Sequence, residues 1–209
     1  MGLKVLLIMK ITKIRDDVWK FKGKGSVYLI KNPEEWVLID AGDPMDRDEL
    51  GREISKVVGL SEINIVLLTH LHYDHLGGLD LFPNAKVFAS GEELQDYVEN
   101  ARGFHFYAND KVDKILREKA KRLKGSGFGL KIIKCPGHTR GSVAFLDEKR
   151  KLLFSGDTIF GGGIEGRIDL PNSIPEKMEE SVHALRRLVI DKGLGLCPGH
   201  GYWEDAQND

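Results

Sequence analysis

The chain has 209 residues, enough for one ordinary domain with a sheet-sized hydrophobic core, and we expect a single domain over residues 1–209. Its 31 lysines and arginines balance 32 acidic residues, and this formal net charge of -1 argues against a purely electrostatic nucleic-acid or membrane binder. Two cysteines cannot form a disulfide framework, and the apolar run Val5–Met9 is too short for a signal-peptide core. We therefore expect a cytoplasmic protein.

The first part of the chain is dominated by short apolar runs separated by turn residues, a pattern typical of strands. Asp43 and Pro44 can begin a helix, whose apolar stripe from Leu50 to Val58 ends before Gly59. The predicted strands are Leu3–Met9, Val27–Ile30, Trp36–Ile39, Ile63–Leu68 and Val87–Ala89.

Two further helices are expected in the middle of the chain. Ser90 and Glu93 have the spacing of a capping box for a helix that runs through Tyr97. The segment Lys111–Lys124 has an apolar stripe under a basic face, which predicts a second helix. Residues 111–134 hold nine basic residues against two acidic ones, a surplus that indicates either a solvated helix face or a contact for an anionic substrate.

The second half repeats the pattern of the first. Ser173 and Glu176 can cap a helix from about Pro175 to Val189. The tetrapeptide Cys-Pro-Gly-His occurs twice, at residues 135–138 and 197–200, each time after a short apolar run. The predicted strands are Leu130–Ile133, Val143–Phe145, Leu152–Phe154 and Leu194–Leu196.

Four potential metal ligands, His70, His72, Asp74 and His75, fall within six residues after the strand Ile63–Leu68. Neither the period of a strand nor that of a helix selects this spacing, so packing does not explain it. Imidazole and carboxylate ligands suit divalent metals, zinc above all, with iron and manganese as alternatives. The cluster therefore predicts a metal site.

Three more candidate ligands share the context of this cluster. His138, Asp157 and His200 each follow a predicted strand, next to small residues. The carboxyl ends of strands are where mixed sheets commonly place their chemistry. Together with the cluster, these residues would complete a site for two divalent metal ions.

The ordered set of seven candidate ligands, preceded by Leu38–Gly42, resembles the metallo-β-lactamase-fold hydrolases, and among them the glyoxalase II-like branch. The resemblance extends from about Val27 to Tyr202. It implies an α/β (α+β) protein, a four-layer αββα sandwich of two mixed β-sheets with helices on the outer faces and metals at one edge.

The resemblance also implies a role for each ligand. His70, His72 and His138 would bind the first metal, Asp74, His75 and His200 would bind the second, and Asp157 would bridge the two. Asp40 matches an aspartate that fixes a histidine ring from outside the ligand shell, although a residue before Gly42 could equally serve the turn itself.

Departures from individual branches narrow the substrate. A ligand set without cysteine, and the absence of a visible export signal, argue against antibiotic hydrolysis, and His72 argues against the flavodiiron branch. The chain ends nine residues after His200, so we expect no helical domain of the kind that helps glyoxalase II hold glutathione. Arg167 and Tyr107 are candidate substrate contacts, and we expect the substrate to be a small molecule.

The expected activity is hydrolysis of a small thioester or related acyl substrate by a metal-bridging hydroxide, since two cations lower the pKa of a shared water from about 15.7 toward 7. Asp74 would orient that hydroxide and accept its proton. Cys135 and Cys197 are expected to be buried thiols, and His105 and His183 to lie outside the site. The alternatives are a metallo-nuclease or phosphodiesterase, suggested by the basic segment, and a mononuclear-iron persulfide dioxygenase with the same motif.

Overall fold

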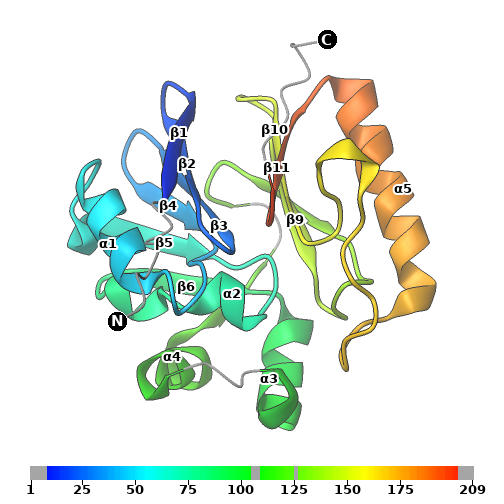
Figure 1. Cartoon of the computed structure of the whole chain (residues 1–209), viewed down its shortest axis with the longest axis horizontal. Coiled ribbons are helices and arrows are strands. Elements are labelled where there is room, and N and C mark those ends of the chain that lie inside the picture. Colours follow the sequence, from blue (N-terminus) through cyan, green and yellow to red (C-terminus); the bar gives the residue numbers. More distant parts are fainter. Residues whose placement is uncertain (1–8, 105–108, 125–126, 202–209) are drawn as a thin grey trace, which may run out of the picture.

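Two β-sheets pack face to face in the computed structural model, which describes residues 9–104, 109–124 and 127–201 (Figure 1). The 7-stranded sheet has the order β1-β2-β3-β4-β5-β6-β7, antiparallel from β1 to β4 and parallel from β4 to β7. Its strands are β1 (Lys10–Arg15), β2 (Val18–Lys22), β3 (Ser26–Lys31), β4 (Trp36–Ile39), β5 (Ile63–Leu67), β6 (Lys86–Ala89) and β7 (Lys121–Arg122).

The 4-stranded sheet has the order β11-β10-β9-β8, with one parallel pair, β10 and β11. Its strands are β8 (Lys131–Lys134), β9 (Val143–Asp147), β10 (Leu152–Gly156) and β11 (Gly195–Pro198). Side chains alternate between its faces, as the pleat requires. In β10, Leu152 and Phe154 fill the core between the sheets, whereas Leu153 faces the outer helix layer.

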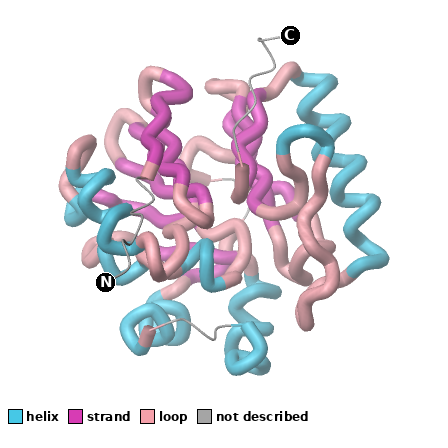
Figure 2. The backbone as a smooth tube through the Cα atoms, in the orientation of Figure 1, coloured by secondary structure: helices cyan, strands magenta, loops and turns pink. Residues whose placement is uncertain are grey.

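Helices cover both outer faces, which confirms the αββα sandwich (Figures 1 and 2). On one side, α5 buries Met178, Val182 and Leu185 against the 4-stranded sheet. On the other, α1 buries Leu50 and Ile54 in the core outside the 7-stranded sheet. The α-helices are α1 (Arg47–Ser55), α2 (Tyr73–Leu76), α3 (Gly91–Phe104), α4 (Asp110–Lys114) and α5 (Pro175–Lys192), with short 3-10 turns at Leu60–Glu62, Leu79–Leu81 and Gly161–Gly163.

The amino-terminal hairpin differs from the prediction. The expected strand Leu3–Met9 lies outside the described residues except for Met9, which belongs to no strand. The strands β1 and β2 were not predicted, because lysines interrupt their apolar runs; one of these lysines, Lys20, is itself buried. Pairing with β3 makes this polar hairpin part of the sheet.

The predicted helix Lys111–Lys124 was wrong in its second half. The helix α4 ends at Lys114 and continues as one π-helical turn, Ile115–Lys119, after which Lys121 and Arg122 pair in parallel with Phe88 and Ala89 of β6. The edge of a sheet thus overrides the local helical pattern.

Among the residues that the structure describes, no helix is long and apolar enough to cross a membrane.

Both predicted capping boxes differ from the structure. Ser90 Oγ accepts the backbone N–H of Glu93 at 3.1 Å, but the Glu93 carboxylate binds other segments instead of returning to Ser90. At the start of α5, the Ser173 hydroxyl donates to the His138 carbonyl oxygen at 2.8 Å. In both places, side chains expected to serve a helix end support loops at the sheet edge.

Candidate metal centre

All seven candidate ligands lie along one edge of the sandwich. The parallel strands β4 and β5 end there, and so do β8, β10 and β11, which run in one direction through the other sheet. The loops and the short helix that follow these strands carry the candidate ligands His70, His72, Asp74, His75, His138, Asp157 and His200. Segments far apart in the sequence therefore meet because the carboxyl ends of parallel strands share an edge.

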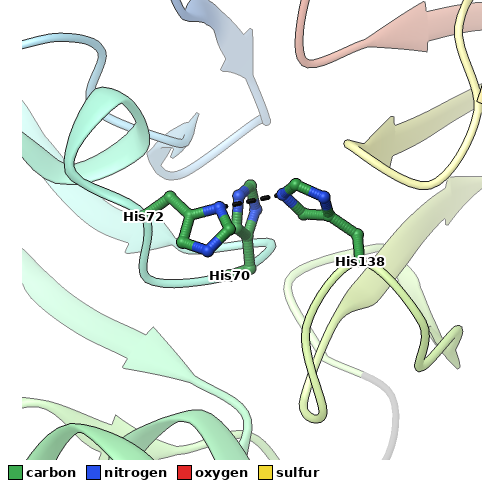
Figure 3. A group of neighbouring side chains, drawn as sticks. All are labelled: His70, His72 and His138. Atoms are coloured by element: carbon green, nitrogen blue, oxygen red, sulfur yellow. Dashed lines mark hydrogen bonds between the residues drawn. The ribbon is translucent and has the colours of Figure 1, made fainter. Parts of the chain in front are cut away.

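The first group consists of His70, His72 and His138, whose rings converge from two sheets (Figure 3). One ring nitrogen of each lies within 4.8 Å of the others. His72 Nδ1 and His138 Nε2 are 2.8 Å apart, slightly closer than the roughly 3.4 Å expected between two nitrogens on one tetrahedral zinc ion with 2.1 Å bonds. These three nitrogens can face a single cation.

The second group consists of Asp74, His75 and His200, again with ligand atoms within 4.8 Å of one another. Asp157 lies between the two groups. Its carboxylate oxygens are 3.3 Å from His75 Nε2, 3.1 Å from His200 Nε2 and 3.5 Å from His138 Nε2. One carboxylate thus reaches both groups, as a bridging ligand must.

In each of the five candidate-ligand histidines, the ring nitrogen that points away from the centre lies within hydrogen-bond distance of an oxygen. Such contacts fix the orientation and tautomer of metal-binding imidazoles. Three partners are side-chain oxygens and two are backbone carbonyls. They are Thr69 Oγ1 for His70 (3.0 Å), Asn172 Oδ1 for His72 (3.3 Å), Asp40 Oδ2 for His75 (2.8 Å), the Arg167 carbonyl for His138 (2.8 Å) and the Lys24 carbonyl for His200 (2.6 Å).

Asp40 is buried directly after β4 and holds two parts of the centre. Its Oδ2 accepts the Nδ1–H of His75 and the Thr69 hydroxyl, while Oδ1 accepts the Thr69 backbone N–H at 2.8 Å. Because the Thr69 hydroxyl donates to Asp40, it can accept from His70 Nδ1–H. Asp40 adopts a left-handed φ of 59°, which costs free energy in any residue other than glycine and is offset here by three hydrogen bonds.

Unpaired buried atoms provide the test of whether a metal fits. Among the described residues, His70 Nε2 is buried without a hydrogen-bond partner, and His75 Nε2 and Asp157 Oδ1 are buried 3.3 Å apart without forming a hydrogen bond. Such atoms are costly unless something binds them. All three point into the candidate centre, so its donor set matches divalent ions with imidazole and carboxylate ligands.

The electrostatics divide the two groups. Burial lowers the pKa of His72 to about 4 and lowers the pKa values of His70 and His138, so these rings are neutral donors. In the second group burial also opposes charge, but the Asp157 and Asp74 carboxylates raise the pKa of His200 to about 10. The carboxylates of Asp74 and Asp157 therefore favour protonation of the His200 ring when no metal is bound, and a divalent cation would displace that proton.

A cavity of about 710 Å³ opens beside the two groups. Ligands from both groups, including Asp74, Asp157 and His200, form part of its lining, so a molecule in the cavity can reach the centre. Arg167, a predicted substrate contact, also lines it, although its guanidinium is paired with Asp169 at 2.9 Å. Tyr107, the other predicted contact, lies outside the described residues.

A family model described as the metallo-beta-lactamase superfamily matches residues 22–200. This chain belongs to that superfamily. It is 31% identical to a probable metallo-hydrolase of Methanocaldococcus jannaschii, with 88% of this chain and 92% of that one covered. It is 30% identical to a hydroxyacylglutathione hydrolase of Haemophilus influenzae, with 73% and 76% covered.

Solved structures agree with this assignment. The crystal structure of TTHA1623 in a di-iron-bound form is 28% identical, with a TM-score of 0.65 and 87% and 90% of the two chains covered. A metallo-beta-lactamase from Pontibacter korlensis, at 20% identity, shares the fold with a TM-score of 0.73 and 95% and 94% covered. The chain is thus a metallo-hydrolase of the metallo-beta-lactamase superfamily with a metal site of histidines and aspartates.

Asp40 was predicted to hold a histidine of this superfamily member, but three other residues that support the ligands, Glu93, Asn172 and Thr69, were not. Glu93 is buried, and its carboxylate accepts the backbone N–H groups of Leu71 at 2.8 Å and Gly141 at 3.0 Å. It therefore ties the loop of His70 and His72 to the loop of His138. Asn172 was missed because no local pattern marks it, whereas Thr69 stands next to His70 and an adjacent hydroxyl was a usable signal.

Residues expected outside the centre are outside it wherever the structure describes them. Cys135 and Cys197 are buried, as expected, and burial raises the pKa of Cys135 to about 12. His183 is exposed on α5, 3.8 Å from Glu179, and belongs to none of the ligand groups. His105 lies outside the described residues.

Proposed function

We propose that this metallo-hydrolase holds two divalent metal ions and hydrolyses a small thioester or related acyl substrate, as glyoxalase II-like enzymes do. The observation that carries the proposal is the second ligand group, Asp74, His75 and His200, joined to the first by Asp157. Likeness to hydroxyacylglutathione hydrolases supports the thioester class. Residues 70, 72 and 138 would hold one ion, and the second group the other.

Two ions bound there would supply activation of a water molecule and polarisation of the scissile carbonyl. The chain's own residues do the rest. Asp74 Oδ2 lies 3.3 Å from His200 Nε2 at the cavity wall, where it can orient the attacking water and accept its proton. Burial raises the pKa of Asp74, but hydrogen bonding to His200 and the charge of His75 outweigh burial and lower this pKa to about 2, so the carboxylate is ionised at neutral pH.

Zinc is the metal we propose first, because neutral imidazoles with carboxylates are typical zinc ligands. Iron is the alternative, supported by the di-iron form of the 28% identical structure. We also propose a small-molecule substrate and a cytoplasmic location, without nucleic-acid or membrane partners. Three of the nine cations of the basic segment form ion pairs, Arg117 with Asp113, Lys131 with Glu148 and Lys134 with Glu92, which reduces the positive charge of this surface.

The proposal is tested by metal analysis of the purified protein, followed by assays with thioester, lactone, phosphodiester and persulfide substrates. We expect two metal ions per chain and turnover of the thioester. His75→Ala should abolish turnover and bind one ion fewer, while His183→Ala, a histidine outside the centre, should match the wild type.

Other results would overturn specific parts. Unchanged turnover in His75→Ala would defeat the two-metal assignment. Oxygen consumption with a persulfide and one iron per chain would replace hydrolysis by dioxygenase chemistry. Phosphodiester cleavage, with polynucleotide binding that weakens steeply as salt rises, would favour the nuclease alternative.

A further inference from the structure

One wall of the cavity is formed by residues 157–173, the loop that carries the candidate ligand Asp157 and leads from β10 to α5 (yellow to orange in Figure 1). The loop folds back on itself, because Phe160 N–H donates to the Ile164 carbonyl at 2.8 Å and Ile159 bridges to Glu165. This fold presents a row of apolar side chains to the cavity. They are Phe160, Ile164, Leu170 and Pro171.

Two of these apolar side chains, Phe160 and Ile164, differ in their surroundings. The Phe160 ring lies 5.8 Å from the His200 ring, edge to face, so this side chain lies beside a candidate ligand. Ile164, which also lines the cavity, is 62% exposed to solvent. Exposing a large aliphatic side chain to water costs free energy, so such a side chain marks a surface that an apolar group can cover.

The charged groups on the same wall are already paired. Arg167 forms a two-point ion pair with Asp169, with both distances at 2.9 Å, and Glu165 pairs with Arg186 at 3.2 Å. Arg167 contributes its backbone carbonyl to His138 and directs its side chain outward, where it is 70% exposed. Apart from candidate ligands, the described lining of this cavity therefore offers no unpaired cation to a carboxylate of the substrate.

We propose that the acyl group of the substrate is uncharged and apolar, and that it extends along this wall from Phe160 toward Ile164. This inference rests on the proposed function and specifies its substrate class. In the reaction, water oxygen bonds to the acyl carbon, the carbon–sulfur bond breaks, and the released thiolate takes up a proton. The acyl chain, rather than the thiol carrier, would contribute the binding free energy.

The test uses acyl thioesters of N-acetylcysteamine with straight chains from acetyl to octanoyl, and the same acyl groups on glutathione. Burying one methylene contributes about 0.8 kcal/mol, or roughly a 4-fold gain, so we expect kcat/KM to rise by up to about 4-fold per added carbon until the chain reaches Ile164. Matched glutathione and N-acetylcysteamine esters should differ by less than about 10-fold. A flat series, a preference for succinyl over butyryl, or a glutathione preference of 100-fold would overturn the inference.

Ile164→Asp provides the variant test, with Ile190→Asp as its matched control. Ile190 is 78% exposed on α5 and does not line the cavity. Ile164→Asp should lower kcat/KM for octanoyl thioester about 10-fold more than for acetyl thioester and retain wild-type metal content, while Ile190→Asp should change neither the octanoyl-to-acetyl ratio nor the metal content. Equal losses for both chain lengths would refute the assigned path.

A binding measurement separates failure of this inference from failure of the proposed function. Thioethers of N-acetylcysteamine with the same alkyl chains lack the scissile carbonyl, so calorimetry reports their affinity without turnover. If affinity rises with chain length but no thioester is hydrolysed, the apolar wall stands and thioester hydrolysis is refuted. If thioesters are hydrolysed but affinity is flat, the apolar wall is refuted alone.

Discussion

Replacing Asp40 by asparagine tests how much the metal centre depends on one buried carboxylate. Asp40 accepts three hydrogen bonds on two oxygens, from His75 Nδ1–H, the Thr69 hydroxyl and the Thr69 backbone N–H. An asparagine has one carbonyl oxygen and an NH2 group. Whichever way the amide turns, one buried N–H faces another donor.

The expected cost follows from these contacts. One unsatisfied buried donor costs about 1–3 kcal/mol of folding free energy. Loss of a carboxylate partner from a metal-binding histidine typically weakens metal binding by about 10–100-fold. For Asp40→Asn we therefore expect lower stability of the metal-free protein in denaturant unfolding, and a weaker affinity of the second metal ion in competition with a chelator.

Asp80→Asn is the control, because Asp80 forms a two-point ion pair with Arg47 at 2.8 Å and contacts no candidate ligand. It should lose stability without losing metal affinity. If Asp40→Asn binds both ions as tightly as the wild type, the argument that Asp40 fixes the His75 ring is refuted.

Three other substitutions test separate features of the structure. Glu93→Gln leaves one acceptor for the two N–H groups that Glu93 now binds, so the first metal ion should bind more weakly while the second is retained, measured as metal per chain after dialysis; equal loss of both would contradict this. Gly166→Ala would place a methyl group against the Asp157 carbonyl oxygen, so this variant should bind less metal. Its control is Gly163→Ala, which has open space around it and a φ of 75° and should cost only about 1 kcal/mol of stability. Similar metal loss in both variants would refute the packing argument. Burial lowers the pKa of Lys20 from its ordinary value of 10.5 to about 8, so between these values the unfolded chain binds more protons and stability should rise with pH; Lys20→Met should remove that rise, and identical pH curves of unfolding free energy would show that Lys20 is not buried as a charged group.

The resemblance carried by the ligand motif implied the sandwich, whereas individual strands and the candidate ligands could be predicted from local signals. Short continuous apolar runs mark buried strands such as β9 and β10, and the spacing of His70 to His75 fits no packing pattern. The strand β7 could not be predicted, since Lys121 and Arg122 become a strand only by pairing with β6. Glu93 was misread for a similar reason, because its partners lie 22 and 48 residues away.

The loop 157–173 both supports candidate metal ligands and lines the cavity. Its backbone holds His138 through the Arg167 carbonyl, and its end holds His72 through Asn172, while Phe160 and Ile164 line the cavity. A change in the path of this loop would therefore disturb two of the three imidazoles of the first group, those of His72 and His138. Substrate preference can change without loss of metal only through side chains that contact no ligand. Ile164 is such a side chain, since it lines the cavity and is exposed. We therefore expect substitutions of Ile164 to change substrate specificity most while changing metal affinity least.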